Sequence, residues 1–403
     1  MNTKEIIELE DRYTAGTYNR YPAAISEGSG SRCRDPEGRE YIDFTSGLGV
    51  NCLGFSDPGW VAAITKQAGL VQHASNLFYN EPCALAARAL AEKTGMEKVF
   101  FCNSGAEANE GAIKAARKYS HMKYGDEFGD DNDVFERFEI ITLENSFHGR
   151  TLATITASGQ ETYHRGYPPF NRGFVYTKAN DIDALKAAVT DRTCAIMIEV
   201  IQGEGGVNNL SREYIQGIAA ICEENDILLI ADEVQTGVAR TGRFMACEHF
   251  GVKPDIATVA KGLGGGLPIG AILFSSKCGD VLQPGEHGST FGGNPVVCAG
   301  AVHILGRIDE KFLADIRVKG EYFRERIAAM NGISHISGIG LMIGASLESK
   351  KPAEVVEACR EKGLLLLTAK DKLRFLPPLI IPKPDIDAGL DILEEVLSEL
   401  SNS

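Results

Sequence analysis

The 403-residue sequence predicts an α/β protein in which helices cover both faces of a mostly parallel sheet. Short runs that are apolar at almost every position, such as "CAIMIEVI" and "ILLIAD", are typical of strands buried on both faces. Helical stretches separate these runs, as at residues 211–224, and this alternation favours strands joined by helical crossovers. After residue 294 the pattern changes to two successive helices and then glycine-punctuated strands. We therefore expect a large α/β domain followed by a smaller α+β domain.

The expected elements divide the chain into three parts. Residues 1–45 begin with an acidic helical pattern and are expected to pack with the small domain. Residues 46–294 form the large domain, whose further strands are "KVFFC", "FEIITLE", "IATVA" and "GAILFSS". Residues 295–403 form the small domain, with helices at 295–307 and 316–330, strands around "GIGLMIGASL" and "KLRFLPPLIIP", and a final amphipathic helix "DIDAGLDILEEVLSEL".

Composition excludes several classes of partner. The 41 basic and 55 acidic residues give a net charge of −14, which disfavours binding to nucleic acid or to an anionic membrane. No apolar run approaches the roughly 20 residues of a transmembrane helix, and the N-terminus lacks a signal-peptide pattern. The ten cysteines include no C-x-x-C pair, which argues against a zinc site or disulfides and favours the cytoplasm. We expect a small-molecule ligand and no metal.

Missing motifs exclude several kinds of enzyme. The sequence has 44 glycines but no G-x-G-x-x-G, which argues against an NAD-dependent oxidoreductase of the same architecture. It has no Gly-Lys pair and therefore no P-loop. The G-x-S-x-G elbow of hydrolases and the H-E-x-x-H zinc motif are also absent.

Two charged residues follow buried strands. "ILLIAD" ends on Asp232, and "IATVA" is followed by Lys261 and a run of glycines. Ligands of open α/β sheets bind outside the carboxyl ends of the strands, so both side chains are candidates for a site. A structural ion pair, or an aspartate that caps a turn, would explain the same residues.

Two further motifs could bind phosphate. In "NSGAEAN", Ser104, Gly105 and Ala106 open a helix whose free N–H groups suit an anion, although Ser104 could simply be its N-cap. In "HGSTFGGNP", Ser289 and Thr290 offer hydroxyls, although a Ser/Thr turn explains them equally. A phosphate cradle, a strand-end acid and a lysine together predict pyridoxal phosphate, which needs a lysine for its aldehyde and an acid for its ring nitrogen.

Along nearly its whole length the sequence resembles the class III (ω-) aminotransferases of fold type I. The similar motifs are "TSGLGVN", "SNLFYNEP", "NSGAEANE", "NSFHGRT", "IQGEGGV", "DEVQTG", "AKGLGGGLPIGA" and "HGSTFGGNP". The resemblance implies a seven-stranded sheet and pyridoxal 5'-phosphate as the cofactor. It is strongest to the branch that transfers an amino group between N2-acetylornithine and 2-oxoglutarate in arginine biosynthesis.

The resemblance also implies roles for individual residues. Lys261 would be the Schiff-base lysine and Asp232 the partner of the pyridine nitrogen. The other cofactor contacts would be the ring-stacking Val234 and Phe147, Gln235 near the ring hydroxyl, Ser104, Gly105 and Ala106 at the phosphate, and Thr290 at the phosphate of the neighbouring subunit, which implies an obligate homodimer. The substrate would contact Arg150 with Ser289 at one carboxylate, Arg374 at the α-carboxylate of 2-oxoglutarate or glutamate, Glu204 as the resting partner of Arg374, and Tyr18.

Other branches of the family remain alternatives. Succinylornithine, acylated diaminopimelate, free ornithine or 4-aminobutyrate could be the amino donor. Leu48 favours an acylated amine, because ornithine-type enzymes resemble this stretch but place a tyrosine there. The pair Arg150 and Arg374 favours a dicarboxylate acceptor over an aminomutase reaction. Val200, Val238 and Ala239 depart from the usual family residues, and this bears on substrate fit.

Overall fold

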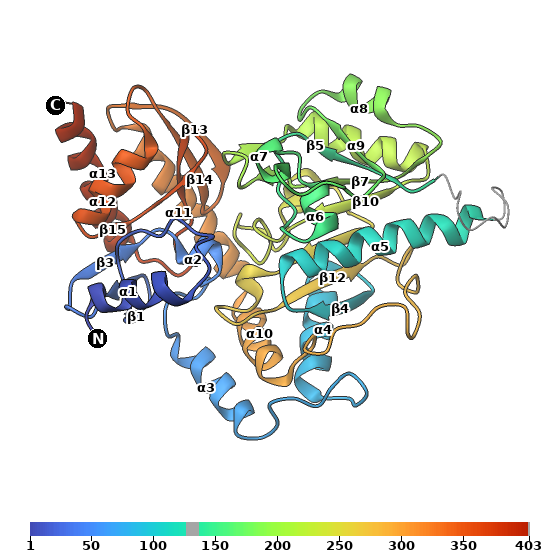
Figure 1. The fold of residues 1–403 in the computed structure, drawn as a ribbon, viewed down its shortest axis with the longest axis horizontal. Coiled ribbons are helices and arrows are strands. Elements are labelled where there is room, and N and C mark those ends of the chain that lie inside the picture. Colours follow the sequence, from blue (N-terminus) through green and yellow to red (C-terminus); the bar gives the residue numbers. More distant parts are fainter. Residues whose placement is uncertain (126–136, 402–403) are drawn as a thin grey trace.

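The computed structural model describes residues 1–125 and 137–401. Figure 1 shows the N-terminal strands next to the C-terminal helices and strands, and the middle of the chain beside them. A seven-stranded sheet in the order β4-β12-β11-β10-β7-β5-β6 forms the centre of the middle part. Its strands are β4 (Lys98–Cys102), β5 (Glu139–Leu143), β6 (Phe174–Thr177), β7 (Thr193–Ile198), β10 (Leu228–Asp232), β11 (Ile256–Val259) and β12 (Gly270–Phe274).

The sheet is mostly parallel. The pairs β11-β10, β10-β7, β7-β5 and β5-β6 are parallel, and only β12 runs antiparallel to both of its neighbours. Parallel neighbours end at the same edge, so residues that follow β10 and β11 lie close together. The register pairs Asp232 with Thr258, three residues before Lys261.

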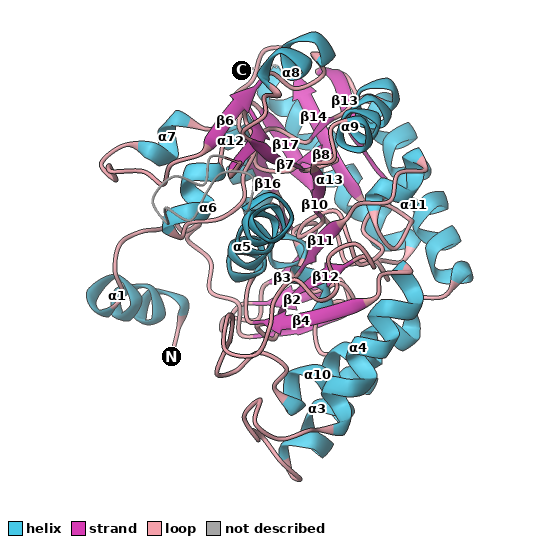
Figure 2. Cartoon of the chain, turned by 90° about the vertical axis from the view of Figure 1, so that its right-hand side faces the viewer, coloured by secondary structure: helices cyan, strands magenta, loops and turns pink. Residues whose placement is uncertain are grey.

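Both faces of the sheet are buried, which explains why its strands are apolar at consecutive positions. Alternate residues belong to two separate cores: Ile141, Ile196 and Leu229 to one, and Ile140, Ala195 and Met197 to the other. Helix α5 (Gly105–Tyr124) packs on the second face, across β12, β11, β7 and β10, as the view in Figure 2 also shows. Helix α9 (Arg212–Glu224) packs against β10 and β7.

Several shorter helices surround this sheet. Helices α3 (Pro58–Ala68), α4 (Glu81–Thr94) and α10 (Pro295–Arg307) form a group at one end, with α10 packed on both others (Figure 2). The connections carry α6 (Leu152–Ala157), α7 (Glu161–His164), α8 (Ile182–Ala188), the strands β8 (Ile201–Gln202) and β9 (Asn208–Asn209), and the 3-10 helices η2 (Ala246–Phe250) and η3 (Lys261–Leu263).

The two ends of the chain come together. A second sheet has the order β1-β2-β3-β15, in which β3 (Glu40–Asp43) pairs in parallel with β15 (Leu364–Leu365). Asp385 accepts hydrogen bonds from Ser31 Oγ at 2.5 Å and from Arg32 Nη2 at 2.7 Å. The remaining N-terminal elements are α1 (Thr3–Tyr13), β1 (Glu27–Ser29), β2 (Arg32–Arg34) and α2 (Ser46–Gly49).

A third sheet, in the order β13-β14-β17-β16, lies in the C-terminal part. Its strands are β13 (Ile333–Ile339), β14 (Met342–Leu347), β16 (Leu367–Ala369) and β17 (Lys372–Phe375). Helices α11 (Glu310–Ala328), α12 (Pro352–Glu361) and α13 (Lys383–Ser401) accompany it. The expected helix at residues 316–330 therefore begins six residues earlier, where Asp309 accepts a hydrogen bond from Phe312 N at 2.8 Å as its N-cap.

The six strands that the sequence predicts in the large sheet are confirmed, and β6 was missed. Strand β6 lies at the sheet edge and is only partly buried, so it lacks a continuous apolar run. All ten cysteines are free thiols. Within residues 1–125 and 137–401, no helix is long and apolar enough to span a membrane, and no group of three or more potential ligands could hold a metal ion.

Candidate active site

The site lies where β10 and β11 end. Strand β10 ends at Asp232, and the first residue of η3 after β11 is Lys261. Asp232 and Lys261 line a cavity of about 460 Å³, and residues of α5 and of the loop after β5 also line it. Nine of the residues predicted from the sequence line it: Ser104, Gly105, Ala106, Phe147, Arg150, Asp232, Val234, Gln235 and Lys261.

Lys261 has an unusual backbone and an unusual environment. Its φ of 40° lies in the left-handed region, which costs a non-glycine residue about 1–2 kcal/mol. Its ammonium makes no hydrogen bond or ion pair with any residue that the structure describes. Burial lowers the pKa of Lys261, and the positive charge of Arg374 adds to this, while the carboxylates of Glu204 and Asp232 oppose it. A buried amine with a lowered pKa is available as a nucleophile and a base.

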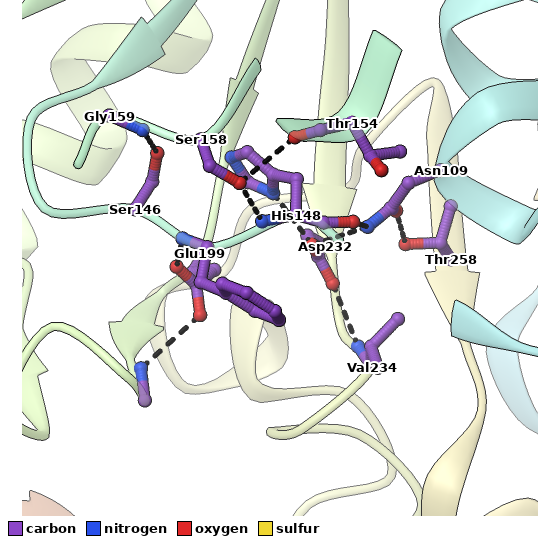
Figure 3. A network of polar contacts seen from close by, with 12 residues as sticks. Asn109, Ser146, His148, Thr154, Ser158, Gly159, Glu199, Asp232, Val234 and Thr258 are labelled. Carbon is purple, nitrogen blue, oxygen red and sulfur yellow. Dashed lines mark hydrogen bonds and ion pairs between the residues drawn. The ribbon is translucent and has the colours of Figure 1, made fainter. Parts of the chain in front are cut away.

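Asp232 is held by three hydrogen bonds (Figure 3). Asn109 Nδ2 donates to its Oδ2 at 2.8 Å, and Val234 N donates to its Oδ1 at 3.1 Å. His148 Nδ1 lies 2.7 Å from the same Oδ2, and both side chains are buried. Burial alone would lower the pKa of His148, but the hydrogen bond and the charge of Asp232, with Glu199, raise it. The carboxylate therefore has a fixed position beside an imidazole whose pKa it raises.

Glu199 is a second buried carboxyl group next to this network. It accepts hydrogen bonds from Phe147 N at 2.9 Å and from Gly203 N at 3.2 Å (Figure 3). Burial raises the pKa of Glu199 to about 7, against the effect of His148. The backbone at Phe147, which lines the cavity, is thus fixed by an acid that the sequence analysis did not select.

The N-terminus of α5 forms another wall. Ser104 is its N-cap and accepts a hydrogen bond from Glu107 N at 3.1 Å, which confirms the capping role considered for this residue in the sequence. Gly105 lies so close to Val234 that an added Cβ would come within 2.6 Å of Val234 Cγ1. Only glycine allows this approach, and Gly105 and Val234 both line the cavity, so the N-terminus of the helix lies at its wall.

The buried Arg374 and the partly buried Glu204 form an ion pair at the side of the site. Arg374 Nη1 donates to Glu204 Oε1 at 2.5 Å, and Arg374 is 3% exposed. Burial would raise the pKa of Glu204, but the charge and the hydrogen bond of Arg374 lower it below its usual range. Glu204 also lines a second cavity of about 870 Å³, which α7 and the loop before β17 border.

Of the residues with an expected role at the site, six do not line the first cavity within this chain: Arg374 and Glu204, which form the ion pair, and Thr290, Ser289, Tyr18 and Leu48. Thr290 and Tyr18 are exposed, and Leu48 is 44% exposed. Ser289 Oγ accepts from Gly292 N at 2.9 Å and from Asn103 Nδ2 at 3.0 Å, which is the turn that the alternative interpretation anticipated. Their roles toward cofactor or substrate stay predictions.

The departures from the family pattern lie beside the site rather than in it. Val200, Val238 and Ala239 are buried and do not line the cavity. Val238 and Ala239 have φ values of 53° and 73°, in the left-handed region. A glycine at the position of Ala239 would adopt this backbone without strain.

Sequence reasoning missed Asn109, His148, Glu199 and Tyr163. Asn109 lies one helical turn after Gly105, and His148 lies in the quoted motif "NSFHGRT", so their spacing from predicted residues could have identified them. Glu199 sits in an apolar strand region, and Tyr163 lies in a separate short helix. Neither had a signal in the sequence that pointed to the site.

The arrangement suits a phosphate-bearing aldehyde cofactor that bonds to a lysine. The residues fit pyridoxal phosphate: the amine of Lys261 has no partner among the described residues, and the buried Gln235 Oε1 also lacks one. A helix N-terminus and a fixed carboxylate line the same cavity as this lysine.

The comparisons with known proteins identify the family. Residues 13–397 match the family model "Aminotransferase class-III". The acetylornithine aminotransferase of Haemophilus ducreyi is 48% identical, covering 99% of this chain and 100% of that protein.

Two solved structures resemble the whole fold. The N-acetylornithine aminotransferase of Stenotrophomonas maltophilia has a TM-score of 0.84 and 33% identity, covering 98% of this chain and 99% of that one. An ornithine aminotransferase from Toxoplasma gondii, described with partial occupancy of PLP at its active site, has a TM-score of 0.92 and 33% identity, covering 99% and 95%. The chain belongs to the class III aminotransferase family, whose cofactor is pyridoxal phosphate.

Proposed function

We propose that the chain transfers the terminal amino group of an N2-acylated ornithine, N2-acetyl-L-ornithine, to 2-oxoglutarate, giving the semialdehyde and glutamate in arginine biosynthesis. The observation that carries this proposal is the pair of arginines around the site: Arg150 at the cavity that Lys261 lines, and Arg374 held by Glu204. The proposal is supported by relatives named acetylornithine aminotransferase, which are 42–48% identical to this chain.

The cofactor's aldehyde would bond to amino groups, and its ring would withdraw electrons from the carbon that loses a proton. Lys261 would hold the aldehyde at rest and, once released, carry the proton between substrate and cofactor carbons. Asp232 would face the ring nitrogen, Val234 and Phe147 the two ring faces, Gln235 the ring hydroxyl, and Ser104, Gly105 and Ala106 the phosphate. These roles follow from the resemblance and from the shared cavity.

Substrate binding would use two cationic positions. Arg150 would bind the carboxylate distal to the reacting carbon in both substrates, since a guanidinium fork suits a carboxylate. Arg374 would bind the α-carboxylate of 2-oxoglutarate or glutamate only. Glu204 would neutralise Arg374 while the acylated amine is bound, because that substrate has no second carboxylate there.

A panel of amino donors tests the substrate. With 2-oxoglutarate as acceptor, acetylornithine should give the highest kcat/KM, above succinylornithine, free ornithine and 4-aminobutyrate. The exposed side chain of Leu48 has no hydroxyl that could bind the free amine of ornithine, so it favours an acylated donor in this comparison. A higher kcat/KM with free ornithine would refute the assignment and favour an ornithine aminotransferase.

We also propose an obligate homodimer in the cytoplasm. Thr290 is exposed and does not line the cavity of its own chain. Both features are expected of a residue that completes the phosphate site of the partner subunit. The ten free thiols fit a reducing compartment. Dilution should release cofactor and activity together as the dimer dissociates, and an active monomer in sedimentation would refute the shared site.

A further inference from the structure

Arg150 contacts two aromatic rings. Its guanidinium carbon lies 4.0 Å from the ring centroid of Tyr163 and 5.6 Å from that of Phe147. It makes no hydrogen bond or ion pair within residues 1–125 and 137–401, although its side chain is exposed. Tyr163 comes from α7, which is distant in sequence from the strand ends that carry Lys261 and Asp232.

The geometry of this contact leaves the arginine free to bind. A guanidinium stacks through its face, whereas its five N–H groups point outward in the plane. Stacking on Tyr163 therefore fixes the orientation of the fork and uses none of its donors. A carboxylate arriving in that plane can accept two parallel hydrogen bonds from a group that is already oriented, so less side-chain entropy is lost on binding.

The same ring is also tied to the cofactor side of the cavity. Tyr163 meets Phe147 edge to face, with ring centroids 5.4 Å apart at an interplanar angle of 71°. Phe147 lines the cavity with Lys261, and its backbone N–H is bound by Glu199. Tyr163 thus packs between the residue expected on the cofactor ring and the residue expected on the substrate carboxylate.

We propose that Tyr163 is a positioning residue that holds Arg150 in its binding orientation. This rests on the proposed function in assigning the carboxylate of an acylated ornithine to Arg150.

Burial of Tyr163 supports this role. Its side chain is half-buried. Tyr163 lines the second cavity, and its partner Arg150 lines the first. Burial raises the pKa of Tyr163, and the nearby carboxylate of Glu204 adds to this, so the ring stays neutral at physiological pH. Its face remains available to the cation, and its hydroxyl is not needed for the contact.

The test measures binding. The probe is N-acetylnorvaline, which has the chain and carboxylate of acetylornithine but no terminal amine and therefore cannot react. Calorimetric titration of the cofactor-loaded protein should give a Kd about threefold to thirtyfold higher for Tyr163→Leu and for Tyr163→Met than for the native protein. Tyr163→Phe, which keeps the ring, should restore the Kd to within about twofold.

Two controls separate positioning from a structural effect. Tyr176 lines the same second cavity without contacting Arg150, so Tyr176→Leu should leave the Kd unchanged. In an Arg150→Ala background, Tyr163→Leu should have no further effect, because both changes remove the same interaction. Equal losses in both backgrounds, or native binding by Tyr163→Leu and Tyr163→Met, would overturn the proposal.

If the native enzyme did not use acetylornithine, the proposed function would fail. Glutarate, a dicarboxylate whose binding does not depend on which amino donor the enzyme uses, would then replace N-acetylnorvaline in the titration. Its Kd with the same variants would decide the role of Tyr163.

Discussion

At residue 261, the backbone and the side chain are both in unfavourable states. The left-handed φ costs free energy, and burial lowers the pKa of the ammonium group. Strain of this kind persists only where the surroundings impose it, and it concentrates at functional sites. The glycines that follow, of which Gly265 and Gly266 have positive φ, let the chain turn away from the cavity.

Lys261→Ala should abolish catalysis without unfolding the protein. The change removes the nucleophile and the base together, so kcat should fall at least about a thousandfold. The strained backbone position stays in place, since alanine adopts the same φ at similar cost. Borohydride reduction of the native protein should attach the cofactor to Lys261, and attachment to any other lysine would contradict the assignment.

Glu199 should make stability depend on pH. Its pKa in the folded protein, about 7, lies above its ordinary value of 4.5, so the folded state binds the proton more tightly. The resulting stabilisation is complete below pH 4.5 and is lost as pH rises through 7. Glu199→Gln should therefore reduce the fall in unfolding free energy between pH 5 and pH 8 by up to about 3 kcal/mol.

Chemical unfolding at a series of pH values measures this difference. The slope with pH is the informative quantity, because glutamine also loses one of the two accepted hydrogen bonds and lowers stability at every pH. The same pH dependence in both proteins would show that Glu199 is not the group that titrates.

At the scale of elements, the site is assembled where secondary structures end. The N-terminus of α5 provides backbone N–H groups, and the ends of β10 and β11 provide the acid and the amine. A third contribution comes from β17, whose Arg374 reaches the segment between β8 and β9 to pair with Glu204. The ion pair therefore links the small sheet to the loops of the large one.

The Arg374–Glu204 pair should distinguish the two half-reactions. Arg374→Ala should slow the glutamate and 2-oxoglutarate half-reaction by about tenfold or more, and affect the acylornithine half-reaction much less. Glu204→Ala should slow mainly the acylornithine half-reaction, because it leaves a buried guanidinium that attracts the wrong carboxylate. Single-turnover kinetics of both variants checks this, and equal losses in both half-reactions would refute the exchange of partners.

At the scale of the whole molecule, residues 1–45 and the C-terminal part share a sheet and an ion pair between Arg32 and the buried Asp385. This supports the proposed division into an N-terminal segment, a large domain at residues 46–294 and a small domain at residues 295–403. Ser31 and Arg32 both bind Asp385, at the start of α13. The site needs this arrangement, because Arg374 lies on the small sheet and Lys261 beside the large one.

Asp385→Ala should loosen the attachment of the N-terminal segment. It leaves Arg32 and Ser31 without their buried acceptor, which costs about 1–3 kcal/mol and should lower Tm by several degrees. Lys351→Ala, which removes only an exposed ion pair of 3.9 Å, is the control and should leave Tm unchanged. Calorimetry of both variants decides, and equal Tm values would show that the contact does not hold the segment.

The sequence by itself determined the class of fold, the family and nine of the residues that line the cavity. Strands buried on both faces are apolar at consecutive positions, and strand-end charges and helix caps are local features, so each leaves a mark in a short stretch. The antiparallel direction of β12 and the edge strand β6 left no such mark.

Only the tertiary structure brought Asn109, His148 and Glu199 to Asp232 and Lys261, and stacked Tyr163 on Arg150. These residues come from separate elements, and their partners are chosen by sheet order and helix packing. Such contacts depend on distances between segments far apart in the chain, which local periodicity does not encode. The site's chemistry was therefore readable from the sequence, while its positioning was decided by the fold.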